Sequence, residues 1–334
     1  MDEGGLRHLF RRRADQSVII TQLQSDAAFE AQVDALTRIN TAEFIQALGL
    51  GHVRRGRSVF ERLCRPAARQ IACDMAQFDA ILGDRGLHRG ANEVLAKLVK
   101  RLQVTGADRI PRHGPLLIAA NHPGLSDVLT IFATLDRADL RIVAAEYPLL
   151  RALPGVNRHF IYVPRERGRR LQVLHEILTH LRSGGAVLLL PAGNIEPDPA
   201  VSRDAVASLD SWSASIGLVA RRVPHVCVVP AVVSGVLLRS YQRHPLTWIR
   251  RRSADRQQLG ATLQVLTRAS LSASVRLRYG PPLTNEVLFA RGRDARAATA
   301  VVIEHTRALV QQQLPNDNPG ALVAPAWSSN LAVG

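Results

Sequence analysis

Short apolar runs alternate with helical segments between residues 116 and 314, and this alternation constrains the fold more than any other feature. The runs have the length of β-strands: Leu116–Ala120, Arg141–Ala145, Phe160–Val163, Ala186–Leu190, Val226–Val233 and Val275–Tyr279. The helical segments are Asp127–Leu135, Arg170–Arg182, Ala205–Arg222, Gln257–Thr267 and about Ala295 to Leu314. Such alternation indicates βαβ units. We therefore expect an α/β fold in which helices flank a mostly parallel sheet.

The first hundred residues show a different pattern. Apolar residues recur at helical spacing within Ala27–Leu50, again after Pro66, and from Val94 to Leu102, with no strand pattern before about residue 115. Residues 315–334 are rich in Pro, Gly, Asn and Ser. We expect a helical N-terminal region at 1–100, an α/β domain at 101–314 and a flexible tail at 315–334.

The chain is strongly basic. Its 43 Lys and Arg against 28 Asp and Glu give a net charge of +15, nearly all of it from arginine, since only Lys97 and Lys100 are lysines. This favours phosphate-bearing partners such as nucleic acid, anionic lipid headgroups or a nucleotide-tailed co-substrate, although a genomic preference for arginine gives the same total. Aromatic residues are only 4%, and no nucleic-acid-binding motif is visible, so nucleic acid is the weaker candidate.

Several features bear on location. Three widely spaced cysteines form no CxxC pair, which favours a reducing compartment. The polar N-terminus lacks the apolar core of a signal peptide, and no stretch reaches about 18 apolar residues. The expected location is cytoplasmic, either free or on a membrane surface.

One strand runs directly into a candidate catalytic turn. After Leu116–Ala120 the chain reaches His122, turns at Pro123-Gly124, and starts a helix for which Ser126 is the expected N-cap. The reversal can bring Asp127 back to the imidazole. A carboxylate on one ring nitrogen fixes the tautomer and leaves the other nitrogen as a proton acceptor. Alone, this spacing also fits a helix cap beside an inert turn histidine.

The turn is the first of four ordered blocks: NHPGLSD at 121–127, FIYVPRER at 160–167, LPAGN at 190–194 and VPAVVSG at 229–235. VRLRYGPPL follows at 275–283. Together they resemble the glycerolipid acyltransferase family, the glycerol-3-phosphate and lysophosphatidic acid acyltransferases. The first block resembles that family's H-x-x-x-x-D (HX4D) core. The resemblance covers about residues 115–283.

The resemblance implies phospholipid-type chemistry: transfer of a fatty acyl group from acyl-CoA or acyl carrier protein to a hydroxyl of a lipid or glycerol-phosphate-type acceptor. It implies no cofactor beyond that thioester co-substrate, and no metal. His122 would be the general base and Asp127 would orient it. A backbone N–H near Gly193 would stabilise the oxyanion. The candidate residues for binding substrate are Arg165, Arg167, Gly193 and Asn194.

The third block departs from the family pattern. Ala192 stands where glutamate is usual, and Asn194-Ile195-Glu196 stands where Thr-Arg-Ser is typical of the glycerol-phosphate branch. Pro-Ala-Gly variants resemble relatives that acylate other acceptors, such as amino-acid lipids, so the acceptor stays open. Glu196 is a candidate replacement for the lost carboxylate.

Three other functions are less well supported by the sequence. A metal-dependent hydrolase using His122 and Asp127 lacks a matching third ligand. A nucleic-acid-binding protein without activity rests only on charge. An inactive acyltransferase fold is disfavoured because both residues are present.

Membrane contact is expected on the inner face, because arginine clusters occur at 11–13, 54–57 and 250–252 and the last follows Trp248 and Ile249.

Overall fold

A computed structural model describes residues 26–50, 56–164, 170–250, 253–267, 269–292 and 294–315. A seven-stranded sheet in the order β1-β7-β6-β2-β5-β3-β4 forms its centre. The strands are β1 Arg101–Thr105, β2 Leu116–Ala120, β3 Leu140–Ala145, β4 Phe160–Val163, β5 Ala186–Leu189, β6 Cys227–Ser234 and β7 Ser274–Tyr279. Only the β6–β7 pair is antiparallel among these strands. The expected mostly parallel α/β fold is confirmed.

The strand β1 was not expected, and the prediction of no strand before about residue 115 is wrong. The helical pattern extended to Leu102, whereas helix α3 ends at Leu98 and β1 pairs with β7 in parallel. Four of the five β1 residues are exposed, because β1 is an edge strand. Its sequence RLQVT therefore carries no buried apolar stripe by which a strand is recognised.

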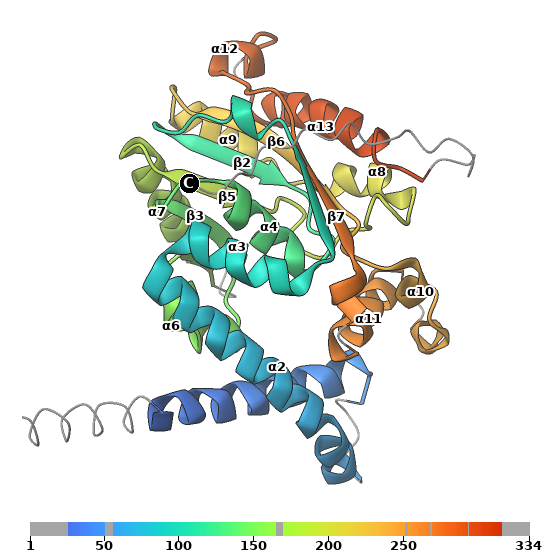
Figure 1. Ribbon diagram of the computed structural model, residues 1–334. Coiled ribbons are helices and arrows are strands. Elements are labelled where there is room, and N and C mark those ends of the chain that lie inside the picture. The colour runs from blue at the N-terminus through green and yellow to red at the C-terminus, as the bar shows by residue number, and fades with distance from the viewer. Residues whose placement is uncertain are drawn as a thin grey trace, which may run out of the picture.

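Helices flank the sheet and make up the described part of the N-terminal region (Figure 1). Their bounds are 26–47 for the first helix, α2 Arg57–Arg85, α3 Leu87–Leu98, α4 Leu125–Thr134, α5 Pro148–Arg151, α6 Pro154–Asn157, α7 Arg170–Arg182, α8 Asp204–Ser208, α9 Ser215–Arg222, α10 Arg239–Gln242, α11 Ser253–Leu266, α12 Asn285–Leu288 and α13 Ala295–Gln311. Short 3₁₀ turns are η1 Ala107–Arg109, η3 Leu209–Ser211, η4 Pro245–Ile249 and η5 Ala269–Ser272. Within the described ranges, no helix is long and apolar enough to cross a bilayer.

The single helix expected over Ala205–Arg222 is instead broken into α8, η3 and α9. At the break the Ser213 N–H donates to the carbonyl of Pro191, and the Trp212 indole donates to Glu196. These contacts to the loop after β5 replace helical hydrogen bonds. The break therefore holds Trp212 against the loop that carries the third block.

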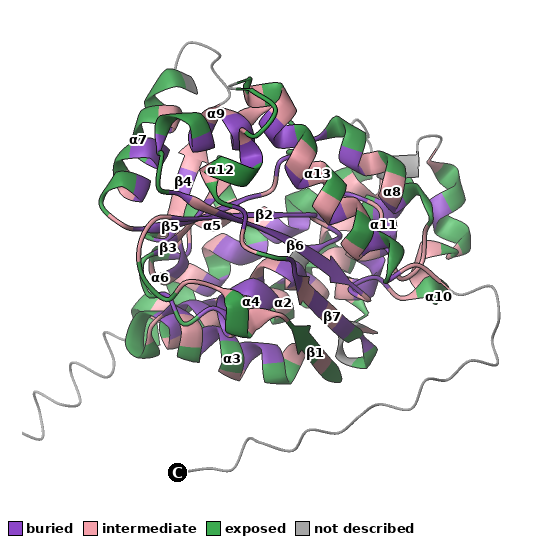
Figure 2. Cartoon of the chain, turned by 90° about the horizontal axis from the view of Figure 1, so that it is seen from above, coloured by how far each residue is buried: buried purple, intermediate pink, exposed green. Residues whose placement is uncertain are grey.

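Two cores lie on the two faces of the sheet. Figure 2 shows the central strands β2 and β6 coloured as buried. Leu116, Ile118 and Ala120 of β2 belong to the core shared with α3 and α4. Leu117 and Ala119 belong to the core shared with α7, α9 and α13. This alternation follows from the two-residue repeat of a strand. Because both faces are covered, β2 is a rigid support for the residues that follow it.

The N-terminal helices join the first core rather than standing apart. Val33 of the first helix and Ala72 of α2 are completely buried in that core. The Asp79 carboxylate of α2 accepts a hydrogen bond from the Val156 N–H at 2.8 Å, which ties α2 to α6. The helix was expected to follow Pro66, but α2 begins at Arg57 and contains the proline, so the buried alanine face outweighs the hydrogen bond that proline removes.

Candidate active site

Three of the four sequence blocks meet at the carboxyl ends of the adjacent strands β6, β2 and β5. The side-chain amide of Asn121, just after β2, donates to the Val233 carbonyl at 2.9 Å. Its oxygen accepts from the Val233 N–H at 2.8 Å. This buried side chain extends the pairing of β2 with β6 past the end of the strand. The first and fourth blocks are thereby held in fixed register, at the edge of the sheet where α/β proteins place their sites.

The turn after β2 brings His122 and Asp127 together. The His122 Nδ1 atom lies 2.8 Å from Asp127 Oδ2, and the carboxylate is completely buried while the histidine side chain is 26% exposed. Asp127 Oδ2 also accepts from the Gly124 N–H at 3.1 Å, and Oδ1 accepts from the Val128 N–H. Gly124, not Ser126, is the N-cap of α4, so the carboxylate occupies the third helical position. A negative charge is favoured there by the helix dipole.

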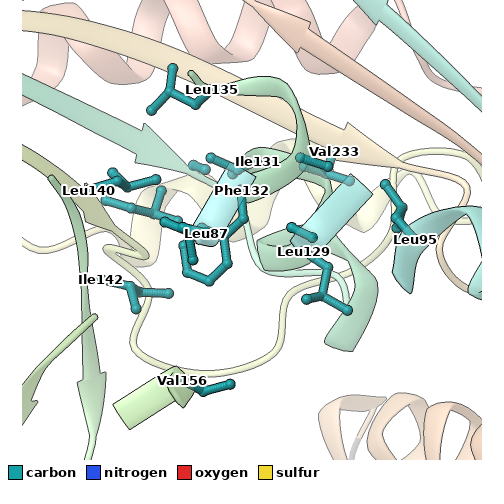
Figure 3. Close-up of a cluster of buried hydrophobic side chains, with 14 of the residues drawn as sticks. Leu87, Leu95, Leu129, Ile131, Phe132, Leu135, Leu140, Ile142, Val156 and Val233 are labelled. Carbon is teal, nitrogen blue, oxygen red and sulfur yellow. The ribbon is translucent and has the colours of Figure 1, made fainter. Parts of the chain in front are cut away.

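Helix α4 owes its fixed position to its apolar face. Leu129, Ile131 and Phe132 pack in the first core with Leu87 of α3 and Ile142 of β3 (Figure 3). Burying each such side chain contributes roughly 1.5–3 kcal/mol. The site carboxylate at the start of α4 is therefore held by the same packing that stabilises the fold.

The electrostatics favour His122 as a proton acceptor. Burial lowers the pKa of His122, but the charge of Asp127 and its hydrogen bond outweigh burial, and Glu196 adds to them, so the pKa lies above its ordinary value. Because Asp127 is the partner of Nδ1, the neutral ring carries its proton there. Within the described residues Nε2 has no hydrogen-bond partner. This leaves the Nε2 lone pair of a partly exposed ring for a substrate proton.

The third block forms a tight turn beside His122. Gly193 has φ 69°, a left-handed conformation that glycine adopts readily, and its N–H donates to the Leu190 carbonyl at 3.0 Å. An N–H near Gly193 was expected to stabilise an oxyanion. The N–H of Gly193 itself is already hydrogen-bonded within this turn. Asn194, which is exposed, follows, and within the described residues its N–H donates to no group.

Two buried carboxylates follow that turn. Glu196 Oε2 accepts from the His122 N–H at 3.0 Å, and Oε1 accepts from the Trp212 indole at 2.9 Å. Asp198 accepts from the N–H groups of Ala200, Gly235 and Leu237, which joins the third block to the fourth. Burial raises the pKa of Glu196 to about 7 and also raises that of Asp198.

Of these residues, the sequence pointed to Glu196 but not to Asp198 or Trp212. The sequence signal for Asp198 was its position two residues after Glu196, in the segment that follows a buried strand. Nothing in the sequence pointed to the tryptophan.

The second block lies farther away. Arg165 and Arg167, the candidate phosphate-binding residues, lie outside the described residues. β4, which precedes them, ends at Val163, three strands from β2 in the sheet order. At the usual strand spacing this is about 14 Å. The end of β4 is therefore not in contact with His122.

No three histidine, cysteine or acidic side chains converge on a metal-sized point within the described ranges. The candidate site thus consists of His122 and Asp127, with Glu196 behind the histidine and the Gly193–Asn194 turn beside it.

A sequence profile of the family described as Acyltransferase matches residues 101–234. The match spans the first three blocks and all of the fourth except its final glycine. Residues 101–234 are therefore similar in sequence to acyltransferases, in agreement with the four blocks.

The chain is also similar to a solved structure, the 1-acyl-sn-glycerophosphate (LPA) acyltransferase PlsC from Thermotoga maritima. Sequence identity is 16%, the match covers 87% of this chain and 96% of that one, and the TM-score is 0.45. A search of curated protein sequences finds no match.

Proposed function

We propose that this protein transfers a fatty acyl group from a thioester, acyl-CoA or acyl-carrier protein, to a hydroxyl of a lipid or glycerol-phosphate-type acceptor. The observation that carries the proposal is the buried Asp127 carboxylate 2.8 Å from Nδ1 of a partly exposed His122. That pair has the geometry of a general base, and it lies in the region that is similar in sequence to acyltransferases.

The reaction needs one proton transfer in each direction. As the acceptor oxygen attacks the thioester carbonyl, its proton passes to His122 Nε2, and Asp127 stabilises the imidazolium. The tetrahedral intermediate then collapses, the C–S bond breaks, and the thiolate takes the proton back from His122. The products are an ester and a free thiol, and the enzyme returns to its starting state.

The tetrahedral intermediate carries a negative charge that requires a hydrogen-bond donor. The Gly193 N–H is engaged in its own turn, so we assign this role to the neighbouring N–H of Asn194. After the left-handed turn at Gly193 the chain runs beside His122, where the Glu196 N–H donates to the His122 carbonyl at 2.8 Å.

For the acceptor, Arg165 and Arg167 are proposed to bind a phosphate, since guanidinium groups pair with phosphate oxygens in a bidentate manner. β4 runs in the same direction as β2, so it ends at the edge of the sheet that carries His122. The alternative acceptor is a lipid without that phosphate, such as an amino-acid lipid. It is favoured by Ala192 and by the acidic Glu196 close to the position where the glycerol-phosphate branch has an arginine.

The function is tested by release of free thiol from acyl-CoA and from acyl-carrier protein. We expect release only when an acceptor is added, with the ester detected by mass spectrometry. A panel with and without an acceptor phosphate separates the two acceptor classes. For a phosphate acceptor, Arg165→Ala should raise its KM and leave the donor KM unchanged. Release without any acceptor would show a thioesterase instead and contradict the proposal.

A surface of η4 suits contact with a lipid bilayer. Leu246, Trp248 and Ile249 are 46%, 75% and 60% exposed. The same segment is flanked by Arg243, which is exposed, and by Arg250, whose guanidinium donates to the carbonyls of Gln46 and Ala47. An exposed arginine near an anionic membrane contributes about 1 kcal/mol before screening by salt, so Arg243 can supply such a contact. Tryptophan is favoured at such interfaces. We propose peripheral binding to the inner face of an anionic membrane through this segment.

We expect the protein to sediment with anionic vesicles at low salt and to be released as salt rises. Trp248→Ala combined with Ile249→Ala should weaken sedimentation several-fold, because two apolar anchors are lost. The matched control is Leu171→Ala on α7, which removes an equally exposed leucine elsewhere. Protein that stays in the supernatant with anionic vesicles at low salt would overturn membrane binding.

A further inference from the structure

Glu196 contacts the proposed base on its backbone side. Its carboxylate Oε2 accepts from the His122 N–H at 3.0 Å, and its own N–H donates to the His122 carbonyl at 2.8 Å. The other oxygen, Oε1, accepts from the Trp212 indole at 2.9 Å and from the Ser208 hydroxyl at 3.2 Å. The side chain is only 2% exposed. One carboxylate thus joins the turn after β2 to the break between α8 and α9.

We propose that Glu196 is a positioning residue for acyl transfer. It fixes the backbone of His122 and adds a second negative charge near the imidazole, whereas Asp127 contacts the ring directly at Nδ1. The inference rests on the proposed function of His122 as base. It assigns to this chain's third block a carboxylate that acts through the histidine rather than on substrate.

The hydrogen bonds specify a carboxylate and not merely a polar side chain. The His122 N–H and the Trp212 indole are groups that only donate, and they approach different oxygens. A carboxylate accepts on both oxygens, whereas an amide accepts on one and would turn its NH₂ toward the other donor. Keeping a buried donor unpaired is costly, so the site is built for the ionised form.

Burial opposes that form. It raises the pKa of Glu196 to about 7, although Trp212, the His122 N–H, Ser208 and the His122 charge all act in the opposite direction. Among the described residues, the charged groups that shift the pKa of His122 are Asp127 and Glu196. The two titrations are therefore coupled: an ionised Glu196 favours the imidazolium that forms during transfer, and the imidazolium favours ionised Glu196.

The test is Glu196→Gln, read by pH–rate profiles and by NMR titration of the His122 ring, with the His122 signal assigned from a His122→Asn sample. We expect kcat to fall about tenfold, the loss of one charge-assisted hydrogen bond. The NMR pKa of His122 should fall, because the charge that raises it is gone, and the acidic limb of the rate profile should move to lower pH.

Trp212→Phe weakens the same charge without removing the carboxylate. It keeps the aromatic bulk but removes the N–H that lowers the pKa of Glu196. Fewer molecules then carry the ionised carboxylate at a given pH, so the NMR pKa of His122 should fall as in Glu196→Gln but by less, and the acidic limb should move to lower pH. A merely structural role for Glu196 would leave the His122 pKa unchanged in both variants.

Asp198→Asn is the matched control, because Asp198 is a buried carboxylate in the same loop that binds backbone N–H groups away from His122. It should lower the melting temperature and leave the acidic limb in place. An unchanged NMR pKa of His122 in Glu196→Gln would overturn the proposal, as would a rate loss no greater than the loss of folded protein. The NMR readout needs no turnover, so it stands apart from the thiol-release assay, in which failure would concern acyl transfer itself.

Discussion

Replacing His122 by alanine is expected to reduce kcat/KM for acyl transfer by about 10²–10⁴-fold, the usual contribution of a general base. The variant should remain folded, because the ring lies at a strand-end turn with a quarter of its surface exposed and is not part of either core. The measurement is acceptor-dependent thiol release, with the melting temperature recorded in parallel.

His113→Ala is the matched control, since His113 is exposed and precedes β2 at the opposite edge of the sheet. It should retain the parent rate. If His122→Ala keeps more than about 1% of the parent rate, a loss below 10²-fold, His122 is not the base that the geometry suggests. If both variants lose activity together with their folded structure, the result reports stability and contradicts the expectation that the ring lies outside the core.

The strands of the sheet could be predicted where they are buried, because a buried strand needs apolar residues that are visible in the sequence. β2 and β5 are covered on both faces, so each stands in the sequence as an unbroken apolar run of strand length. β1 is an exposed edge strand with a polar sequence, and only its pairing with β7 makes it a strand. The residues of one short segment do not reveal which distant strand it pairs with.

The site divides in the same way. His122 and Asp127 are five residues apart across a Pro-Gly turn, so their contact is local and could be inferred from the sequence. Glu196 lies 74 residues from His122, and the contact exists because β5 pairs beside β2 and ends at the same edge. Asp198 meets Gly235 through the neighbouring pair β2 and β6. Contacts that depend on strand order become visible only in the folded chain.

Asp127→Asn is expected to lower kcat by about 10²–10⁴-fold while the substrate KM values change little, because the change acts through His122. In the parent, Asp127 Oδ2 accepts from Gly124 N–H and lies against His122 Nδ1, and Oδ1 accepts from Val128 N–H. An asparagine must turn its NH₂ toward one of these groups. Facing Nδ1, it makes Nδ1 the acceptor and moves the ring proton to Nε2, so the base is lost. Facing Val128, its NH₂ opposes the Val128 N–H, which is also a donor, and this costs about 1–3 kcal/mol.

The pH dependence of stability gives Asp127→Asn a second readout. The Asp127 charge is what raises the pKa of His122 above its ordinary value despite burial. A raised folded-state pKa contributes stability that is fully present below the unfolded-state pKa and is lost as pH rises through the folded-state pKa. The gap in unfolding free energy between parent and variant should therefore be widest in mildly acidic buffer and should narrow as the pH rises. Asp136→Asn, an exposed aspartate just beyond the other end of α4, should show no such gap. A variant that keeps a tenth of the parent rate, or a gap that does not change with pH, would reduce Asp127 to a partner of the helix N-terminus.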